Sequence, residues 1–269
     1  AQGVDQGVSL EGRVEDHAAA DVRQAKRVAV AAHATHHAAH HAGGLLAVAE
    51  SLKADMVAVG MPGEAIRVHY TGLDADRFRP QDRAAARAEW DAPHGTRILL
   101  SVGALIPRKG QALVIEALAT LPPDVHYWLA GKGDDEAALR ALAQRHGVGD
   151  RVRFLGSVPH DRLPSLYAVA EAMVLPSASE GLANAWVEAL ACGVPLILSD
   201  IAPARELVAL VGAGRVAERT PSALAAAVAR QLAETVDAPA LAARTHARFN
   251  WDRNGAELAA HLRQVARSG

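Results

Sequence analysis

Short apolar runs alternate with amphipathic stretches through most of the chain. Apolar runs that predict buried strands lie at residues 96–102, 125–130, 152–155, 172–175 and 196–198. Apolar positions at helical spacing predict helices that begin near Gly110, cover 136–146 and 163–170, begin again at Asn184, and cover 222–234. Strands and helices that alternate in this way predict an α/β fold, a Rossmann-like doubly wound parallel sheet with helices on both faces.

The pattern differs on either side of this block. Residues 45–61 predict one helix that Pro62 and Gly63 terminate, followed by a short strand over 66–70. After residue 237, two further helical stretches remain.

The first 43 residues contain little that could pack, because they hold one leucine and no aromatic residue. We expect them to be irregular or disordered. His33, His37 and His41 recur at a spacing that one helix face could present to a metal. No carboxylate or cysteine lies near these histidines, so we interpret any metal binding there as adventitious and expect no metal site.

Composition narrows the class of protein. The 269 residues are 50% hydrophobic and 22% charged, which is typical of a folded chain, and the net charge of -2 at pH 7 argues against a nucleic-acid partner. The single cysteine, Cys192, excludes an internal disulfide and favours a cytoplasmic location. The sequence has no apolar run long enough to span a bilayer and no signal-peptide pattern, although peripheral membrane contact stays possible.

Candidate chemistry concentrates in residues 177–200. Glu180 and Glu188 lie on either side of the predicted helix start at Asn184, in a loop that follows a buried strand. Loops at this end of a parallel sheet bind ligands, and free amides at a helix start favour an anion. Carboxylates beside an anion site suit a ligand that carries hydroxyls as well as phosphates, which is the chemistry of a nucleotide-sugar. The alternative is a solvated helix start that acidic residues stabilise.

The order of residues in this segment also carries a family resemblance. Glu180, seven residues, then Glu188 followed by ALACGVP resembles the signature of retaining family-4 (group 1) glycosyltransferases of the GT-B fold. The resemblance implies that Glu188 holds the ribose hydroxyls and that Glu180 contacts the transferred sugar. It also implies that the backbone of Leu182, Ala183 and Asn184 contacts the diphosphate. The family often has an aromatic residue and a glycine at 182 and 183, so the methyl group of Ala183 narrows the approach to the phosphates.

A second loop supplies a cation. Lys109 closes the loop after the strand at 96–102, and the resemblance assigns it to the donor diphosphate, where an ammonium can neutralise a leaving group without a metal. The alternative is a solvated loop lysine. The family commonly has a second cation, an arginine, at the position of Ala104, and Arg108 could replace it. The order of glycine and lysine here excludes a P-loop.

The resemblance extends from residue 51 to the end of the chain. Residues 130–158 match the family along their whole length, and the loop at 156–159 then borders the nucleobase, with Val158 as the candidate contact. Residues 68–80 resemble the interdomain connection. The terminal stretch around Trp251 resembles the family helix that bends there and returns to the first domain.

These matches give a predicted domain organisation. Residues 1–43 precede the fold, 44–79 are a remnant of a truncated, vestigial first domain with its linker, 80–236 bind the nucleotide-sugar, and 237–269 are the returning helices.

Two other motifs are rejected on their context. Asp74-Ala75-Asp76 matches a metal-binding Asp-x-Asp motif but follows no strong strand and no complete domain. Gly212 and Gly214 imitate a dinucleotide fingerprint, but Pro221 begins the next helix too late, so we interpret these glycines as a turn.

The sequence therefore predicts a glycosyltransferase that moves a sugar from a nucleotide-sugar to a glycan or lipid-linked acceptor, with retention and without a cofactor. Because the first domain looks incomplete, we expect this chain to bind the donor but to transfer poorly. The alternative is a non-catalytic nucleotide-binding or scaffold fragment.

Overall fold

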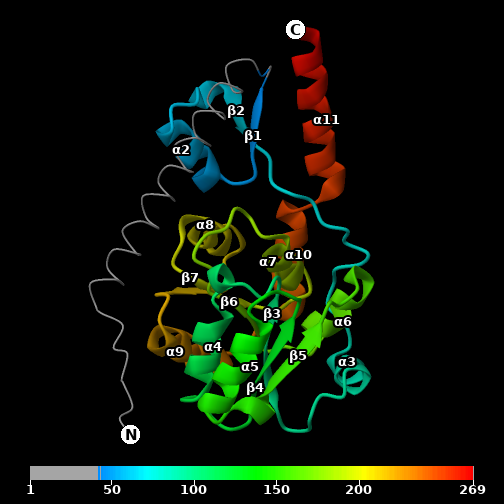
Figure 1. The fold of residues 1–269 in the computed structure, drawn as a ribbon. Helices are drawn as coiled ribbons and strands as arrows, with labels where there is room; N and C mark the ends of the chain where they lie inside the picture. Colours follow the sequence, from blue (N-terminus) through cyan, green and yellow to red (C-terminus); the bar gives the residue numbers. More distant parts are fainter. Residues whose placement is uncertain (1–41, 43, 269) are drawn as a thin grey trace, which may run out of the picture.

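The computed structural model describes residue 42 and residues 44–268, and its main feature is a six-stranded parallel sheet (Figure 1). The strand order is β5-β4-β3-β6-β7-β8. The strands are β3 (Arg97–Val102), β4 (Val125–Ala130), β5 (Val152–Gly156), β6 (Ala172–Leu175), β7 (Leu196–Ser199) and β8 (Arg215–Ala217).

The order in which the strands are added to this sheet reverses between β3 and β6. It runs outward from β3 to β4 and β5, returns to place β6 against the other side of β3, and then runs outward again to β7 and β8. Leu99 pairs with Ala172 where β3 and β6 meet. Such a switch point is where doubly wound sheets bind ligands, outside the carboxyl ends of the strands.

Helices cover both faces of the sheet (Figure 1). Ile98 and Leu100 of β3 point into one core, and Leu99 between them points into the other, as the alternation of side chains along a strand requires. The first core is completed by α3 (Arg83–Glu89), α6 (Leu163–Ala168), α7 (Asn184–Ala191), α8 (Ala202–Val211) and α10 (Ala238–Arg248). The second core is completed by α4 (Gln111–Leu118), α5 (Glu136–Arg145) and α9 (Pro221–Leu232).

The predicted doubly wound parallel fold is therefore confirmed, and every predicted strand of the sheet lies within about a residue or two of its expected bounds. The turn at the two glycines is also confirmed, since Gly212 (φ 66°) ends α8 and Gly214 (φ 100°) precedes β8. Three elements were not predicted: α3, α8 and β8.

The prediction for residues 45–61 was wrong. In place of one helix, the chain forms the strand β1 (Leu45–Ala47) and then α2 (Glu50–Ala58). β1 pairs in parallel with β2 (Ile66–Val68), which follows the short 3-10 turn η1 (Gly63–Ala65), and Ala47 is fully buried in this pairing. A short apolar run is compatible with either element, and the pairing partner 21 residues away decides for the strand.

Glu206 of α8 joins this small β1–α2–β2 unit to the larger sheet. Its carboxylate accepts from the amides of Glu50 and Ser51 at the start of α2, at 2.8 and 2.9 Å, and from the hydroxyl of Tyr70 at 2.7 Å. Burial raises the pKa of Glu206, but these donors outweigh burial and leave the pKa below its ordinary value. Burial and the neighbouring carboxylate raise the pKa of Tyr70 to about 12, so the hydroxyl stays a donor.

The C-terminal helices run back along the molecule. α10 packs on α7, and after a bend the last helix, α11 (Trp251–Ser268), runs beside the β1–α2–β2 unit (Figure 1). Gly44 lies against His261 and Val265 of this helix. The predicted bend at Trp251 is confirmed, whereas the domain boundaries at residues 43, 79 and 236 stay predictions.

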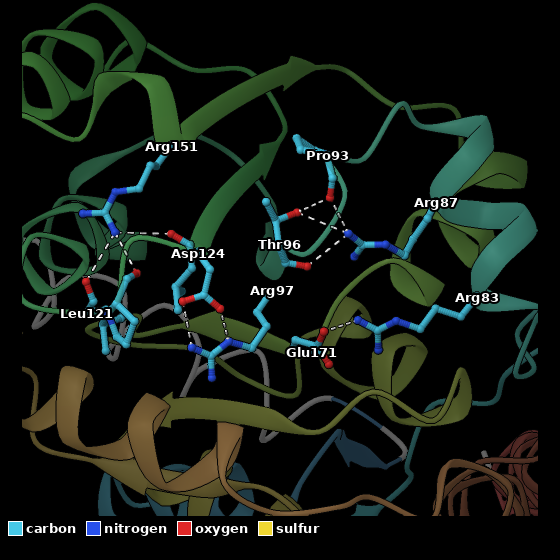
Figure 2. Close-up of polar contacts among 11 residues, drawn as sticks. Arg83, Arg87, Pro93, Thr96, Arg97, Leu121, Asp124, Arg151 and Glu171 are labelled. Carbon is cyan, nitrogen blue, oxygen red and sulfur yellow. Dashed lines mark hydrogen bonds and ion pairs between the residues drawn. The ribbon is translucent and has the colours of Figure 1, made fainter.

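Arginines hold together the amino edge of the sheet, where the strands begin (Figure 2). Arg97 at the start of β3 makes a two-point contact with Asp124, at 2.6 and 3.0 Å. Arg151 donates to the carbonyl oxygens of Leu118 and Pro122 at 2.8 and 3.0 Å, and so caps the end of α4.

Within residue 42 and residues 44–268, no helix is both long and apolar enough to cross a membrane. The histidines at 33–41 lie outside the described residues, and of residues 1–43, which we expect to be irregular, only residue 42 is described.

Candidate functional site

Two predicted site residues meet at the switch point of the sheet. Lys109 follows β3 and Glu180 follows β6, and the lysine ammonium donates to Glu180 Oε1 at 2.5 Å although 71 residues separate them. Both side chains are largely buried, with 13% and 9% exposed. The structure thus brings together the cation and the carboxylate that the sequence placed in separate loops.

Gly110 makes this meeting possible. Its φ is 75°, and a Cβ atom added to it would lie 2.4 Å from the carbonyl oxygen of Pro176 in the loop after β6. Only glycine combines this backbone angle with such a close approach. The two loops therefore touch at Gly110 and place Lys109 beside Glu180.

Further contacts fix the two loops to each other. The amide of Ala178 donates to the carbonyl oxygen of Arg108 at 2.7 Å, and the Arg108 guanidinium donates to the carbonyl oxygen of Ser179. Arg219, which follows β8, donates to the carbonyl oxygen of Pro176 at 2.9 Å and to that of Pro107 at 3.2 Å. Pro176 belongs to the loop after β6 and Pro107 to the loop after β3.

The environment of Glu180 favours its charged form. Burial alone raises the pKa of this carboxyl, but the hydrogen bond and the charge of Lys109, the Ser177 side chain and the charge of Arg108 outweigh burial. The pKa of Glu180 therefore lies below its ordinary value. Arg108 Nη1 is 3.4 Å from Glu180 Oε1, so the arginine expected to replace the missing second cation is at the site.

Leu182, Ala183 and Asn184 form the approach to α7. Ala183 is the N-cap of this helix, and because alanine has no polar side chain, no side chain caps the first amides of the helix. Leu182 and Ala183 are half-buried against the core, and Asn184 is exposed. Free amides at a helix start favour an anion, and the contact of these residues with a diphosphate stays a prediction.

Glu188 lies one turn into α7 and is 7% exposed. One carboxylate oxygen is 3.1 Å from His160 Nε2, and the other accepts from the buried hydroxyl of Tyr167 at 3.1 Å. Burial, followed by the charge of Glu188, raises the pKa of Tyr167 well above its ordinary value, so this hydroxyl stays protonated and donates. Burial and the same carboxylate also raise the pKa of the Cys192 thiol, which is buried as predicted.

The structure also places Val158, a predicted site residue, and Asp74, which belongs to a rejected motif. Val158 is half-buried against the core on the α6–α7 face, two residues before His160, and its contact with a nucleobase stays a prediction. Asp74 of the rejected Asp-x-Asp motif accepts from the amides of Asp76 and Arg77, both at 3.1 Å, and so forms a turn.

Sequence reasoning missed His160, Tyr167 and Arg219. Arg219 could have been found from the short strand before it, because the carboxyl ends of parallel strands meet at one edge. That strand was interpreted as part of a turn. His160 and Tyr167 contact Glu188 only in three dimensions, and their spacing gives no signal.

Comparisons with known proteins identify the family of the chain. Residues 82–248 match the family described as "Glycosyl transferases group 1". The chain is 33% identical over 214 residues to a GDP-mannose-dependent alpha-(1-6)-phosphatidylinositol monomannoside mannosyltransferase of Mycolicibacterium smegmatis, covering 74% of this chain and 56% of that protein. It is 34% identical over 218 residues to D-inositol 3-phosphate glycosyltransferase 2 of Catenulispora acidiphila, covering 74% of this chain and 50% of that protein. The chain spans about half the length of the curated relatives it matches.

Solved structures show the same fold. Sucrose-phosphate synthase from Thermosynechococcus elongatus superposes with a TM-score of 0.74 at 29% identity, covering 83% of this chain and 58% of that one. Anabaena HepE in complex with UDP and glucose superposes with a TM-score of 0.72 at 24% identity, covering 82% and 62%. With the match over 82–248, these similarities show that the chain belongs to the group 1 family of glycosyl transferases.

Proposed function

We propose that this chain carries the donor-binding half of a retaining glycosyltransferase that uses a nucleotide-sugar. The observation that carries the proposal is the buried pair of Lys109 and Glu180 at the switch point between β3 and β6. A cation and a carboxylate held together there suit a ligand that presents phosphates to one group and sugar hydroxyls to the other.

The diphosphate would lie between the loop after β3 and the start of α7. An ammonium has three donors, so Lys109 can keep its contact with Glu180 and also donate to a phosphate oxygen. Arg108 adds a second positive charge near the same point, and the uncapped amides at Asn184 add partial positive charge. The family commonly has an arginine where this chain has Ala104, and the position of Arg108 supports the proposal that Arg108 replaces it.

The remaining parts of the donor follow from this placement. Glu188 would accept hydrogen bonds from the ribose hydroxyls, and the loop with Val158 would border the base. Glu180 would contact the transferred sugar. These roles come from the family resemblance, and the position of both carboxylates beside the start of α7 supports them.

In the reaction, the bond between the sugar and the diphosphate breaks and leaves an oxocarbenium-like sugar. The main electrostatic task is to stabilise the negative charge that grows on the leaving group, which Lys109 and the helix start can do without a metal or another cofactor. The acceptor hydroxyl then forms the new bond on the same face of the sugar and gives its proton to an oxygen of the departing diphosphate.

The acceptor is the less defined partner. A relative in Mycolicibacterium smegmatis is named for an acceptor that is a phosphatidylinositol mannoside, which supports a glycan or lipid-linked acceptor here, reached through peripheral membrane contact. We also propose a cytoplasmic location, which the free, buried Cys192 supports.

Calorimetry with UDP, GDP and ADP tests the donor site. At least one should bind, and Glu188→Ala should weaken its binding by about 1–3 kcal/mol, the scale of a lost charge-assisted hydrogen bond. Glu136→Ala, on the exposed face of α5, is the matched control and should bind as the wild type does. Failure of all three nucleotides to bind the wild-type chain would remove the proposed function.

Product formation separates an enzyme from a nucleotide-binding scaffold. Nucleotide-sugars of the bound base are incubated with glycan and lipid-linked acceptors, with and without EDTA. Transfer that resists EDTA and gives the donor's anomeric configuration agrees with the proposal. Inversion of that configuration contradicts it.

A further inference from the structure

The carboxylate of Glu188 is held from two sides. His160 Nε2 approaches one oxygen, and the Tyr167 hydroxyl donates to the other, both at 3.1 Å. A carboxylate offers roughly four acceptor positions, so these contacts leave about half of them unused. The Glu188 side chain is not sealed from the solvent, since 9% of its surface is exposed.

The contacts of His160 define which ring nitrogen carries the proton. Arg77 Nη1 lies 3.2 Å from His160 Nδ1, and a guanidinium can only donate. Nδ1 therefore accepts, the proton of the neutral ring is on Nε2, and Nε2 donates to Glu188. The ring of Phe78 packs edge-on against the same imidazole, with 5.0 Å between centroids.

Arg77 and Phe78 belong to the segment that connects β2 to α3. This segment is itself fixed: Phe78 is 2% exposed, and the amide of Leu73 donates to the carbonyl oxygen of Phe249 at 3.0 Å. His160 therefore links the connection between the two units of the protein to the carboxylate on α7.

We propose that His160 is a positioning residue that sets the specificity of the site for ribose over deoxyribose. The terminal torsion of a glutamate is broad, so a carboxylate held on one side only can rotate. With His160 on one oxygen and Tyr167 on the other, the plane of the Glu188 carboxylate is fixed, and its unused acceptor positions can receive the two hydroxyls of a ribose. The inference rests on the proposed function, which gives Glu188 the ribose.

The test compares each nucleoside diphosphate with its 2′,3′-dideoxy form by calorimetry, using whichever of UDP, GDP and ADP binds the wild-type chain. We expect His160→Ala to weaken binding of the ribose form about tenfold, the scale of a lost hydrogen bond to a charged group, and to leave the dideoxy form unchanged. His160→Gln should restore most of the loss, because its amide nitrogen can donate to Glu188.

Two controls, His94→Ala and Arg79→Ala, separate positioning from general damage, and Arg77→Ala tests the contact behind His160. His94→Ala removes an exposed loop histidine of the same domain and should change neither affinity. Arg77→Ala removes the donor to His160 Nδ1 without touching the site. It should weaken the ribose form a few-fold, less than His160→Ala does, because Arg77 acts on Glu188 only through His160. Arg79→Ala, in the same segment, should have no effect.

The outcomes distinguish this inference from the proposed function. If Glu188→Ala loses the preference for ribose and His160→Ala keeps it, the positioning role is wrong and the site assignment stands. If His160→Ala weakens the ribose and dideoxy forms equally, the positioning role is also wrong. If Glu188→Ala keeps the preference, or no nucleotide binds the wild type, the proposed function fails and takes this inference with it.

Discussion

At both edges of the six-stranded sheet, where the strands begin and where they end, a cation pairs with a carboxylate, but the two pairs differ. At the amino edge, Arg97 binds the carboxylate of Asp124, 27 residues away, and Arg151 binds carbonyl oxygens. The pair of Arg97 and Asp124 keeps 34% and 40% of its side-chain surface exposed. At the carboxyl edge, Lys109 and Glu180 come from loops 71 residues apart and are almost wholly buried.

The difference shows which charges only pair with each other and which are available for chemistry. A half-exposed pair adds little stability and needs no further partner. The buried ammonium of Lys109 lies beside a carboxylate and an uncapped helix start. It has donors that no partner in the described part of the chain uses, so it can also bind a ligand. The predictions below substitute matched residues at the two edges.

The largest effect is expected at Gly110, for which Gly95 at the amino edge is the matched control. Both have positive φ, 75° and 71°, but a Cβ atom at Gly95 meets nothing within 4 Å. Gly110→Ala should cost about 2–4 kcal/mol of unfolding free energy, from the backbone angle and the clash with Pro176 together. Gly95→Ala should cost about 1 kcal/mol, from the angle alone.

Urea unfolding of the two variants measures both values. Gly110→Ala should also weaken nucleotide binding, because Lys109 moves with the loop. Equal losses of stability in the two variants would show that the contact between the loops is not tight.

The second prediction concerns binding. Lys109→Ala should weaken nucleoside diphosphate binding by about 1.5–3 kcal/mol, the range for hydrogen bonds to charged groups. Arg97→Ala removes a cation at the opposite edge and should leave the affinity unchanged while lowering stability by at most about 1 kcal/mol. Calorimetry and thermal melting of both variants check this, and a loss of affinity in Arg97→Ala would contradict the division between the edges.

The sequence predicted the sheet and the carboxyl-edge residues, but not the amino edge. Strands buried on both faces are continuous apolar runs, so β3, β4, β6 and β7 were visible without a structure. Glu180 and Glu188 could be named because they lie on either side of a helix start after such a strand, and the family resemblance singled out Lys109.

What the sequence did not predict depends on pairing at a distance. β1 is three residues long and is a strand only because β2 lies beside it. β8 is equally short, and missing it concealed Arg219. His160 reaches Glu188 through the fold of the loop after β5, which no local pattern records.

The third prediction compares two arginines that bind carbonyl oxygens. Arg219→Ala removes the bridge between the loops of Lys109 and Glu180, and should weaken nucleotide binding by about 0.5–1.5 kcal/mol, the net value of a typical hydrogen bond. Arg151→Ala removes comparable bonds at the amino edge and should lower only the stability. Arg219→Lys should not recover the affinity, since one ammonium lacks the planar fork that reaches both carbonyls. If Arg151→Ala weakened nucleotide binding and Arg219→Ala did not, the binding role assigned to Arg219 would be wrong.

The smallest expected effect is on acid stability. The pKa of Glu180 lies below its ordinary value, because Lys109 and its neighbours outweigh burial, and the pKa of Asp124 is lowered chiefly by its hydrogen bond to Arg97. A carboxyl with a depressed folded-state pKa contributes stability above its unfolded value, and that stability is lost as the pH falls through the folded value. The contributions should therefore be full at neutral pH and should decline below about 4.5 for Glu180 and about 3.8 for Asp124.

Salt distinguishes the two carboxyls. Melting temperatures of Glu180→Gln and Asp124→Asn are compared with the wild type between pH 7 and pH 3, at low salt and at 1 M salt. Because ions screen exposed pairs, the difference due to Asp124 should nearly vanish at 1 M salt, where the Debye length is about 3 Å. The difference due to Glu180 should persist, since its pair with Lys109 is largely buried. If salt removes both differences alike, the carboxyl-edge pair is exposed in solution and the contrast between the edges fails at its central point.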